Sequence, residues 1–441
     1  MKLYSIAILA AWALSTSAAS AREDINSTYT NPILPGFHPD PTCIFVESWN
    51  QTFFYVTSTF LAFPGLPIYA SQDLQTWTLI SSVLNRPSQL PEFTTEVSET
   101  GGIWAPTIRY HNGTFYVSTT VVDDTKNISD ASRWNNVLFT ARNPYDSSSW
   151  SDVTRFDFNG YDTSLFWDDD GQFYMLGAGD MNSRPGMFLA PLDVETGEIG
   201  LQINVWNGTG SPSLEGPRML KKDAFYYLVA AEGGTFLDHM AIIARSEAIT
   251  GPYESFPGNP VLTNANTTEY IQAVGHADLF PDANGNWWGV ALAMRADLVN
   301  LAVPMGRETV LYPVSWSAEG WPVATQVRGV MSGWPLQAAN LTGEFGFVPP
   351  NGPTLLARRQ TETLFSFSAV VDFQPQQIDE EAGVTLYISQ DDHVELGVVL
   401  LPGSSVNNGT GSPLASFFRF RGESETAEIE ETLFPFPDGW N

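Results

Sequence analysis

Cysteine and basic residues are both scarce in this chain. Cys43 is the single cysteine among 441 residues, so no intramolecular disulfide can form and stability must come from a large core. Lysine and arginine number only 20 against 49 aspartates and glutamates, a net charge of −29. This acidity argues against nucleic acid and anionic membranes as partners, and it suits a soluble protein that acts on neutral or cationic material.

Histidines and several familiar catalytic motifs are also few or missing. The five histidines show no ligand-like spacing, and H-E-x-x-H does not occur. The chain contains no P-loop, no G-x-G-x-x-G and no G-x-S-x-G. Metal-dependent hydrolysis, nucleotide chemistry and a serine nucleophile are therefore poorly supported, and we expect no required cofactor and no catalytic metal.

Long hydrophobic runs are absent after the N-terminus. Residues 1–21 combine a basic Lys2, an apolar stretch and Ala19-Ser20-Ala21 as a cleavage site, which predicts a secretory signal peptide rather than a membrane span. Eight N-x-S/T sequons fit a glycosylated, secreted, extracellular protein; they begin at Asn26, Asn50, Asn112, Asn127, Asn207, Asn266, Asn340 and Asn408.

Strong helix-forming runs are few, whereas short alternating segments between Gly, Asn, Asp and Pro are common, which predicts an all-β chain. Five stretches repeat a turn, paired aromatics and a β-run, with separations of 61, 58, 53 and 61 residues between their first aromatics. Those aromatics are Phe54, Phe115, Phe173, Tyr226 and Trp287. The period predicts a five-bladed β-propeller over residues 22–330, in preference to a two-sheet sandwich with long insertions.

The repeat aligns residues that carry chemistry. Eleven positions before the last four aromatics stand Trp104, Asp162, Glu215 and His276, and Asp40 lies 14 before the first. Equivalent positions of successive blades converge on the propeller axis, so three carboxylates, a tryptophan and a histidine are expected to meet at one mouth. Each alone is more often a turn or core residue, but three acids together repel one another and indicate a functional site.

Paired carboxylates with separated pKa values are the apparatus of glycoside hydrolysis. One donates a proton to the leaving oxygen, and the other activates water or attacks carbon. A third nearby carboxylate can keep the acid protonated through like-charge coupling.

Seven motifs, in order along roughly residues 29–325, resemble glycoside hydrolase family 43: PGFHPDP, GIWAP, YDTSLFWDDDG, LEGPRML, AEGGT, GHADLF and MGRETVL. The resemblance implies a five-bladed propeller and an inverting mechanism. It implies Asp40 as general base, Asp162 as the pKa-modulating and orienting aspartate, and Glu215 as general acid.

The resemblance also implies substrate-binding roles for five further residues. Arg307 is expected to contact substrate hydroxyls and Asp162, with a surface ion pair to Glu308 as the alternative. Trp104 and Phe60 resemble the aromatic walls of the terminal sugar subsite, although Phe60 is equally compatible with a core position. Thr235 lines the same pocket, and His276 binds substrate or the water shell of a possible structural calcium ion.

The C-terminal part forms a separate segment. Residues 331–360 are interpreted as a linker and docking segment, and residues 361–441 resemble the start of the concanavalin A-like β-sandwich that follows the propeller in such enzymes. Because about 80 residues complete only part of a two-sheet sandwich, we expect a partial, truncated module.

The expected function is exo-acting release of xylose or arabinose from plant cell-wall polysaccharides or their oligosaccharides: xylan, arabinoxylan or arabinan. The alternative within enzymes is an endo-arabinanase. From another class, a propeller that binds carbohydrate without catalysis is the second alternative.

Overall fold

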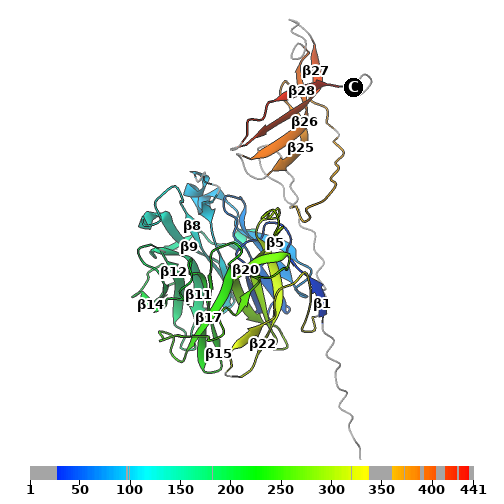
Figure 1. Ribbon diagram of the computed structural model, residues 1–441. Helices are drawn as coiled ribbons and strands as arrows, with labels where there is room; N and C mark the ends of the chain where they lie inside the picture. Colours follow the sequence, from blue (N-terminus) through cyan, green and yellow to red (C-terminus); the bar gives the residue numbers. More distant parts are fainter. Residues whose placement is uncertain are drawn as a thin grey trace, which may run out of the picture. The chain divides into compact units, whose positions relative to one another are not determined.

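The computed structural model describes residues 27–95, 98, 100–180, 182–318, 320–336, 360–371, 373–387, 392–403, 413–424 and 427–436. The predicted signal peptide and most of the predicted linker lie outside these residues. The chain divides into two compact units, residues 1–362 and 363–441 (Figure 1). The described parts are strands, turns and short 3-10 segments, which confirms the expected all-β class.

The first unit contains, within its described residues, five antiparallel sheets of four or five strands that follow one another along the chain. The strands of the first two sheets are β2 (Thr42–Val46), β3 (Thr52–Val56), β4 (Gly65–Ser71) and β5 (Thr78–Leu84), then β6 (Gly102–Ile103), β7 (Thr107–His111), β8 (Thr114–Val122), β9 (Trp134–Ala141) and β10 (Thr154–Phe156). Four 3-10 segments lie in the connections: η1 (Pro87–Gln89), η2 (Pro91–Thr95), η3 (Ala131–Arg133) and η4 (Ser147–Ser149).

The third to fifth sheets have the same antiparallel order. Their strands are β11 (Gly160–Trp167), β12 (Phe173–Gly179), β13 (Met187–Pro191) and β14 (Ile203–Trp206); β15 (Glu215–Lys222), β16 (Phe225–Glu232), β17 (Met240–Ser246), β18 (Glu254–Ser255) and β19 (Leu262–Thr263); and β20 (Ile271–Pro281), β21 (Trp287–Arg295), β22 (Glu308–Trp316) and β23 (Pro322–Ala324).

One strand of each sheet takes part in a closed ring of contacts. β2 packs against β7, β7 against β11, β11 against β15, β15 against β20, and β20 against β2. In Figure 1 the sequence colours accordingly pass around the first unit from blue through cyan and green to yellow. We call β2, β7, β11, β15 and β20 the ring strands, because residues at their beginnings are brought together from all five sheets.

The ends of this unit are joined by β1 (Ser27–Thr30), which pairs antiparallel with β24 (Val330–Gly333). The Asn31 amide donates to the Leu311 carbonyl over 2.9 Å and accepts from the Leu311 N–H over 2.8 Å. The first residues are therefore fastened to β22, in the last sheet of the ring.

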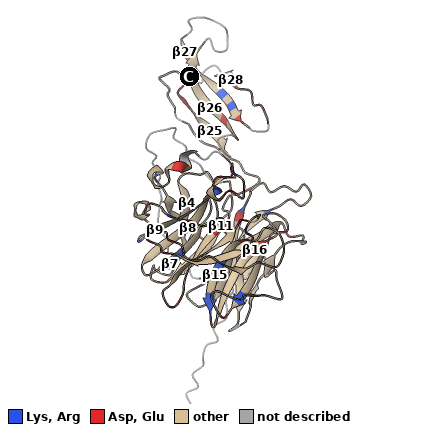
Figure 2. Cartoon of the chain, turned by 90° about the vertical axis from the view of Figure 1, so that its left-hand side faces the viewer, with Lys and Arg blue, Asp and Glu red and all other residues tan. Residues whose placement is uncertain are grey.

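The repeated aromatics form the core between neighbouring sheets, which explains their regular spacing. Rings from adjacent sheets pack at centroid distances of 4.7–6.1 Å in four pairs: Phe54–Phe115, Tyr116–Trp167, Phe166–Tyr226 and Tyr227–Trp316. Phe53 and Phe280, 5.8 Å apart, join the first sheet to the fifth. Burial of aromatic surface thus helps to hold sheet to sheet, and the strands of this unit are mostly tan in the charge-coloured view of Figure 2.

Three ring strands have irregular backbone where the chemistry-bearing residues stand. The pairing register shifts between Tyr161 and Ser164 in β11, between Glu215 and Arg218 in β15, and twice between Gln272 and Asp278 in β20. Such bulges turn a side chain away from the regular alternation of a strand.

Left-handed backbone occurs at the bulges of β11 and β20 and in the turn before β2. Asp40, Asp162 and His276 have φ values of 52°, 53° and 47°, which is uncommon for residues other than glycine. The same unusual conformation at or just before the beginning of three ring strands indicates a shared requirement for where these side chains point.

The second unit has one described sheet, in the order β25 (Glu381–Tyr387), β26 (His393–Pro402), β27 (Leu414–Glu423) and β28 (Thr432–Pro435). All its pairings are antiparallel. Among the described residues of the whole chain, no helix has the length and hydropathy needed to cross a bilayer.

Candidate active site

Asp40 stands immediately before β2, in the proline-rich turn between Pro39 and Pro41, and only 6% of it is exposed. Its Oδ2 accepts a hydrogen bond of 2.7 Å from the Ser58 hydroxyl. The Pro39 carbonyl in turn accepts from the Ser58 N–H over 3.2 Å. The turn and the end of β3 therefore fix both the backbone and the carboxylate of Asp40.

Asp162 and Glu215 come from neighbouring ring strands, β11 and β15. The Gly216 N–H donates to Asp162 Oδ2 over 2.9 Å, so the residue next to Glu215 holds the Asp162 carboxylate. Asp162 is 3% exposed, and the Glu215 side chain is 16% exposed.

The pKa values of both carboxyls are raised. Burial and then the charge of Asp40 raise the pKa of Asp162, against the opposing effects of Arg218, the Gly216 N–H and Arg307. Burial, then Asp162 and Asp40, raise the pKa of Glu215, while Arg307 and a hydrogen bond from the Thr235 side chain lower it. The three acids, which we call the acid cluster, are thus close enough to influence one another, and burial together with like charge favours the protonated form of both Glu215 and Asp162.

Two basic side chains face Asp40 at longer range. Arg307 Nη1 lies 3.8 Å from Asp40 Oδ2, and His276 Nδ1 lies 3.8 Å from Asp40 Oδ1. The His276 ring also packs on Gly216, where an added Cβ would come within 2.9 Å of it. His276 therefore lies between the turn that carries Asp40 and the strand that carries Glu215.

The alternative role for Arg307 does not match the structure. Glu308 instead binds Arg295 through two contacts of 2.8 Å and accepts the Gly36 N–H over 2.7 Å. Arg307 turns to the acid cluster, where the carboxylate it faces is Asp40 and not the expected Asp162, and its guanidinium lies 5.5 Å from the Phe60 ring centroid.

The predicted aromatic residues lie around the same cluster. The Phe60 ring packs beside Phe37 at 5.8 Å, and Phe60 is only partly buried. Trp104 contacts Tyr161, the neighbour of Asp162, edge-on at 5.8 Å. The structure thus brings seven of the eight residues that the sequence singled out to one place, and it links the eighth, Trp104, to them through Tyr161.

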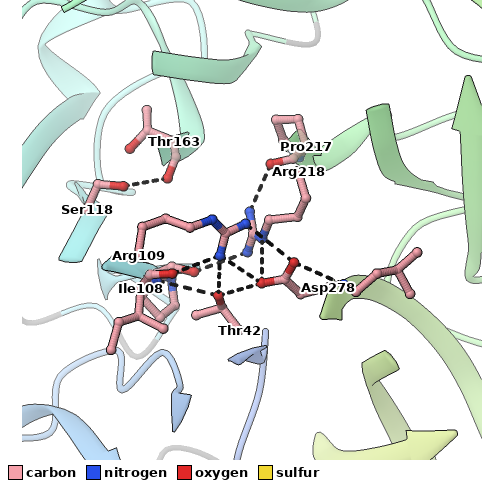
Figure 3. Close-up of polar contacts among 10 residues, drawn as sticks. Thr42, Ile108, Arg109, Ser118, Thr163, Pro217, Arg218 and Asp278 are labelled. Atoms are coloured by element: carbon pink, nitrogen blue, oxygen red, sulfur yellow. Dashed lines mark hydrogen bonds and ion pairs between the residues drawn. The ribbon is translucent and has the colours of Figure 1, made fainter. Parts of the chain in front are cut away.

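A second group of polar and charged side chains lies two to five residues further along four of the ring strands (Figure 3). Asp278 Oδ2 accepts from Arg109 over 3.0 Å and from the Thr42 hydroxyl over 2.7 Å, and lies 4.0 Å from Arg218 Nε. Arg218 also donates to the carbonyls of Pro217 and Pro106 over 3.0 and 3.1 Å. This arginine–aspartate network connects four ring strands and has two cationic groups for one carboxylate.

Sequence reasoning missed this network, as well as Ser58 and His239. Eight or nine positions before the repeated aromatics stand Ser164, Arg218 and Asp278, so the same register could have found part of the network. Ser58 and His239 lie outside the ring strands and have no such signal.

Direct metal coordination does not fit the described residues, because they include no group of three or more His, Cys, Asp or Glu side chains arranged around a possible ion. Binding of calcium through water near His276 stays a prediction.

The first unit matches a known protein family. The model for glycosyl hydrolases family 43 matches residues 29–322. The chain belongs to glycosyl hydrolases family 43. This confirms the resemblance seen in the motifs, and the chain is a glycosidase.

The model of the beta xylosidase C-terminal concanavalin A-like domain matches residues 340–437. Among family 43 proteins, a non-reducing end alpha-L-arabinofuranosidase of Bacteroides ovatus is 34% identical over 86% of this chain and 77% of its own length. A xylosidase/arabinosidase of Butyrivibrio fibrisolvens is 33% identical over 84% of this chain and 79% of its own.

Solved family 43 structures superpose along nearly the whole chain. The BlXynB protein of Bacillus licheniformis has a TM-score of 0.73 at 28% identity and covers 92% of this chain and 83% of its own. A xylan beta-1,4-xylosidase of Bacillus halodurans has a TM-score of 0.72 at 28% identity and covers 93% and 85%.

Proposed function

We propose that this protein is a secreted, inverting exo-glycosidase that releases terminal xylose or arabinose from hemicellulose-derived oligosaccharides or arabinoxylan. The observation that carries the proposal is the acid cluster, in which Glu215 is favoured as proton donor while Asp40 is held by Ser58 and faced by Arg307. An acid and a base kept in different protonation states are what glycoside hydrolysis requires.

In the proposed reaction Glu215 donates its proton to the glycosidic oxygen as the bond from that oxygen to the anomeric carbon breaks. A water molecule attacks the anomeric carbon from the opposite face, and Asp40 takes the proton that this water loses. One water is consumed and the configuration inverts. Glu215 ends without its proton and Asp40 ends with the proton of the water, so exchange with solvent must restore both groups before the next turnover.

Asp162 is proposed to act on Glu215 rather than on the sugar. It accepts the N–H of Gly216, the next residue in the chain, and its charge raises the pKa of Glu215. It therefore both orients the backbone that carries the acid and disfavours loss of the acid's proton.

The substrate contacts are proposed from their positions around the acid cluster. Arg307, Thr235 and His276 supply polar groups for sugar hydroxyls, and Trp104 and Phe60 supply apolar faces for the ring. Aromatic faces combined with a few directed polar groups are the usual composition of a small sugar pocket.

The pentose specificity is inferred from the relatives, which are named arabinofuranosidase, xylosidase/arabinosidase and beta-xylosidase. The test is a panel of 4-nitrophenyl β-xyloside, 4-nitrophenyl α-L-arabinofuranoside, xylobiose and linear arabinan, with wild type beside Glu215→Ala. Pentose release by wild type and its loss in Glu215→Ala are expected. Oligomers from arabinan would favour the endo-arabinanase, and tight oligosaccharide binding without turnover would favour a binding propeller.

The stereochemistry has its own test. Proton NMR of the first sugar released from xylobiose, followed before mutarotation, should show the inverted anomer. A retained anomer would overturn the assignment of Asp40 as a base that activates water.

The remaining architecture is proposed as follows. The five sheets are proposed to be the blades of a five-bladed propeller, followed by a linker that begins at residue 331 and by a β-sandwich domain, for which the match of the concanavalin A-like domain model to residues 340–437 is the support. The protein is proposed to be secreted and to act on plant cell-wall polysaccharide. The acidic composition supports this, and it argues against nucleic acid or a membrane as partner. Secretion is also supported by exposed sequon asparagines at 50, 112, 127, 207 and 266.

A further inference from the structure

The loop between β16 and β17, residues 233–239, presents two side chains to Glu215. Thr235 gives it a hydrogen bond that favours the ionised carboxylate. His239, the last residue of the loop, is fully buried, and its Nε2 lies 3.8 Å from Glu215 Oε1. The two contacts differ because a hydroxyl can donate to a carboxylate, whereas the role of an imidazole depends on where its protons are.

The His239 ring has one fixed orientation. Its Nδ1 lies 3.0 Å from the Ala273 carbonyl oxygen, and because a carbonyl only accepts, Nδ1 must carry a proton. The ring lies flat on Gly275, where an added Cβ would come within 2.6 Å of three ring atoms. The fixed ring therefore directs Nε2 at Glu215.

The charges around the ring favour its neutral form. Burial lowers the pKa of His239 to about 4, against the opposing effects of the Ala273 carbonyl and Asp40, and Arg307 lowers it further. The nearby His276 ring is also disfavoured as a cation, because burial and Arg218 lower its pKa. With Nδ1 protonated and the ring neutral, Nε2 carries a lone pair and can only accept a hydrogen bond. Nε2 has no hydrogen-bond partner among the described residues.

The geometry points to His239 as a positioning residue that keeps Glu215 in its acid form, by presenting an acceptor to the protonated carboxyl and no donor to the carboxylate. At 3.8 Å the two atoms are not hydrogen-bonded, and a Glu215 movement of about 1 Å would bring them to bonding distance. This inference rests on the proposed role of Glu215 as general acid. An ion pair between imidazolium and carboxylate would have the opposite effect and would favour loss of the proton.

The kinetic test uses His239→Asn, whose amide can keep the bond to the Ala273 carbonyl while nothing replaces Nε2. The alkaline limb of kcat reports the acid in the substrate complex, and we expect its midpoint to fall by about one pH unit. Turnover of xylobiose, whose leaving group needs protonation, should fall about 10-fold or more, and that of the activated 4-nitrophenyl xyloside less than about 3-fold.

The matched control is His111→Asn, a half-buried histidine stacked on Trp167 at 4.8 Å, outside the site. This variant should leave the acidic and alkaline limbs of the kcat profile unchanged, as well as the turnover of both xylobiose and 4-nitrophenyl xyloside. An alkaline limb that stays in place or moves upward in His239→Asn would overturn the inference, as would equal losses on the two substrates.

A measurement without turnover separates this inference from the proposed function. Carbon-13 NMR of labelled glutamate, with the Glu215 signal assigned through Glu215→Gln, should give a lower titration midpoint in His239→Asn than in wild type. An unchanged midpoint sinks the inference even if the enzyme is active, and a lowered midpoint supports it even if no pentose is released. If His239→Asn does not fold, nitrogen-15 NMR of wild-type His239 decides: an Nδ1–H tautomer near neutral pH is expected, and an imidazolium would refute the role.

Discussion

The acid cluster and the arginine–aspartate network share the ring strands, yet they differ in how closely their buried carboxyl groups are paired with cations. In the network, Asp278 has direct partners at 2.7 and 3.0 Å, and cations outnumber the carboxylate. In the acid cluster three carboxyls share one neighbourhood, and the basic groups facing Asp40 stay at 3.8 Å.

The difference shows which group serves the fold and which serves chemistry. A buried charge with close partners is stabilising only as a complete set, so the network holds four ring strands in one arrangement. The acid cluster leaves its charges partly uncompensated, which raises two pKa values and costs stability. Arg218 links the two, because its charge lowers the pKa of Asp162.

The largest expected effect separates the groups by activity. Asp40→Asn removes the proposed base with little change in volume, and kcat should fall about 10³-fold or more on xylobiose. Urea unfolding should show unchanged or slightly higher stability, because one of three like charges is gone. An enzyme that keeps most of its activity would contradict the role of Asp40.

The next effect concerns stability. Asp278→Asn leaves the buried Arg218 and the partly buried Arg109 without their carboxylate, and the free energy of unfolding should fall by about 3–5 kcal/mol. Urea denaturation of the folded fraction measures it. Stability within about 1 kcal/mol of wild type would show that the network is dispensable and would break the comparison.

The pH dependence of stability gives a smaller effect with a definite sign. Below the ordinary carboxyl pKa of 4.5, Glu215 is protonated in both the folded and the unfolded chain and has no effect. Above it the unfolded chain loses this proton first, so the stability of the folded chain falls as pH rises towards the raised pKa. In Glu215→Gln this fall should be smaller, with a gain on the order of 1 kcal/mol at pH 8, measured by thermal unfolding from pH 4 to 8. Parallel curves for the two proteins would mean that the pKa of Glu215 is not raised.

The smallest effects come from two buried hydroxyls, one in each group. Ser58→Ala removes the donor to Asp40 and should lower kcat/KM about 10-fold with little loss of stability. Thr42→Val removes the donor to Asp278 and should lower stability by about 1–2 kcal/mol with little change in kcat/KM. The same outcome for both variants would erase the distinction between the groups.

Much of the fold and the site could be predicted from the sequence because both repeat. The aromatic pairs mark the sheets, since each pair fills the space between neighbours, and counting back from them finds Asp162, Glu215 and His276. Equivalent positions converge in a repeated architecture, so register alone predicts proximity. The role of each acid came from family resemblance, since register cannot distinguish a base from an acid.

Ser58 and His239 could not be predicted in this way. Ser58 follows β3 and His239 precedes β17, so neither shares the register of the ring strands. Each reaches its carboxylate through a loop whose course depends on distant partners, such as the Ala273 carbonyl beneath His239. Register predicts only contacts that recur from sheet to sheet, whereas the contacts of Ser58 and His239 each occur once.

The sequence by itself determined the all-β class, the membership of family 43 and the set of acids that gather at one end of the ring. Only the tertiary structure decided which group contacts each carboxyl. Asp40 accepts a hydrogen bond from Ser58, Asp162 accepts one from the Gly216 N–H, and Glu215 faces the lone pair of His239 Nε2. The physical reason is that protonation depends on burial, distance and donor direction, and these are fixed only when segments far apart in the chain pack together.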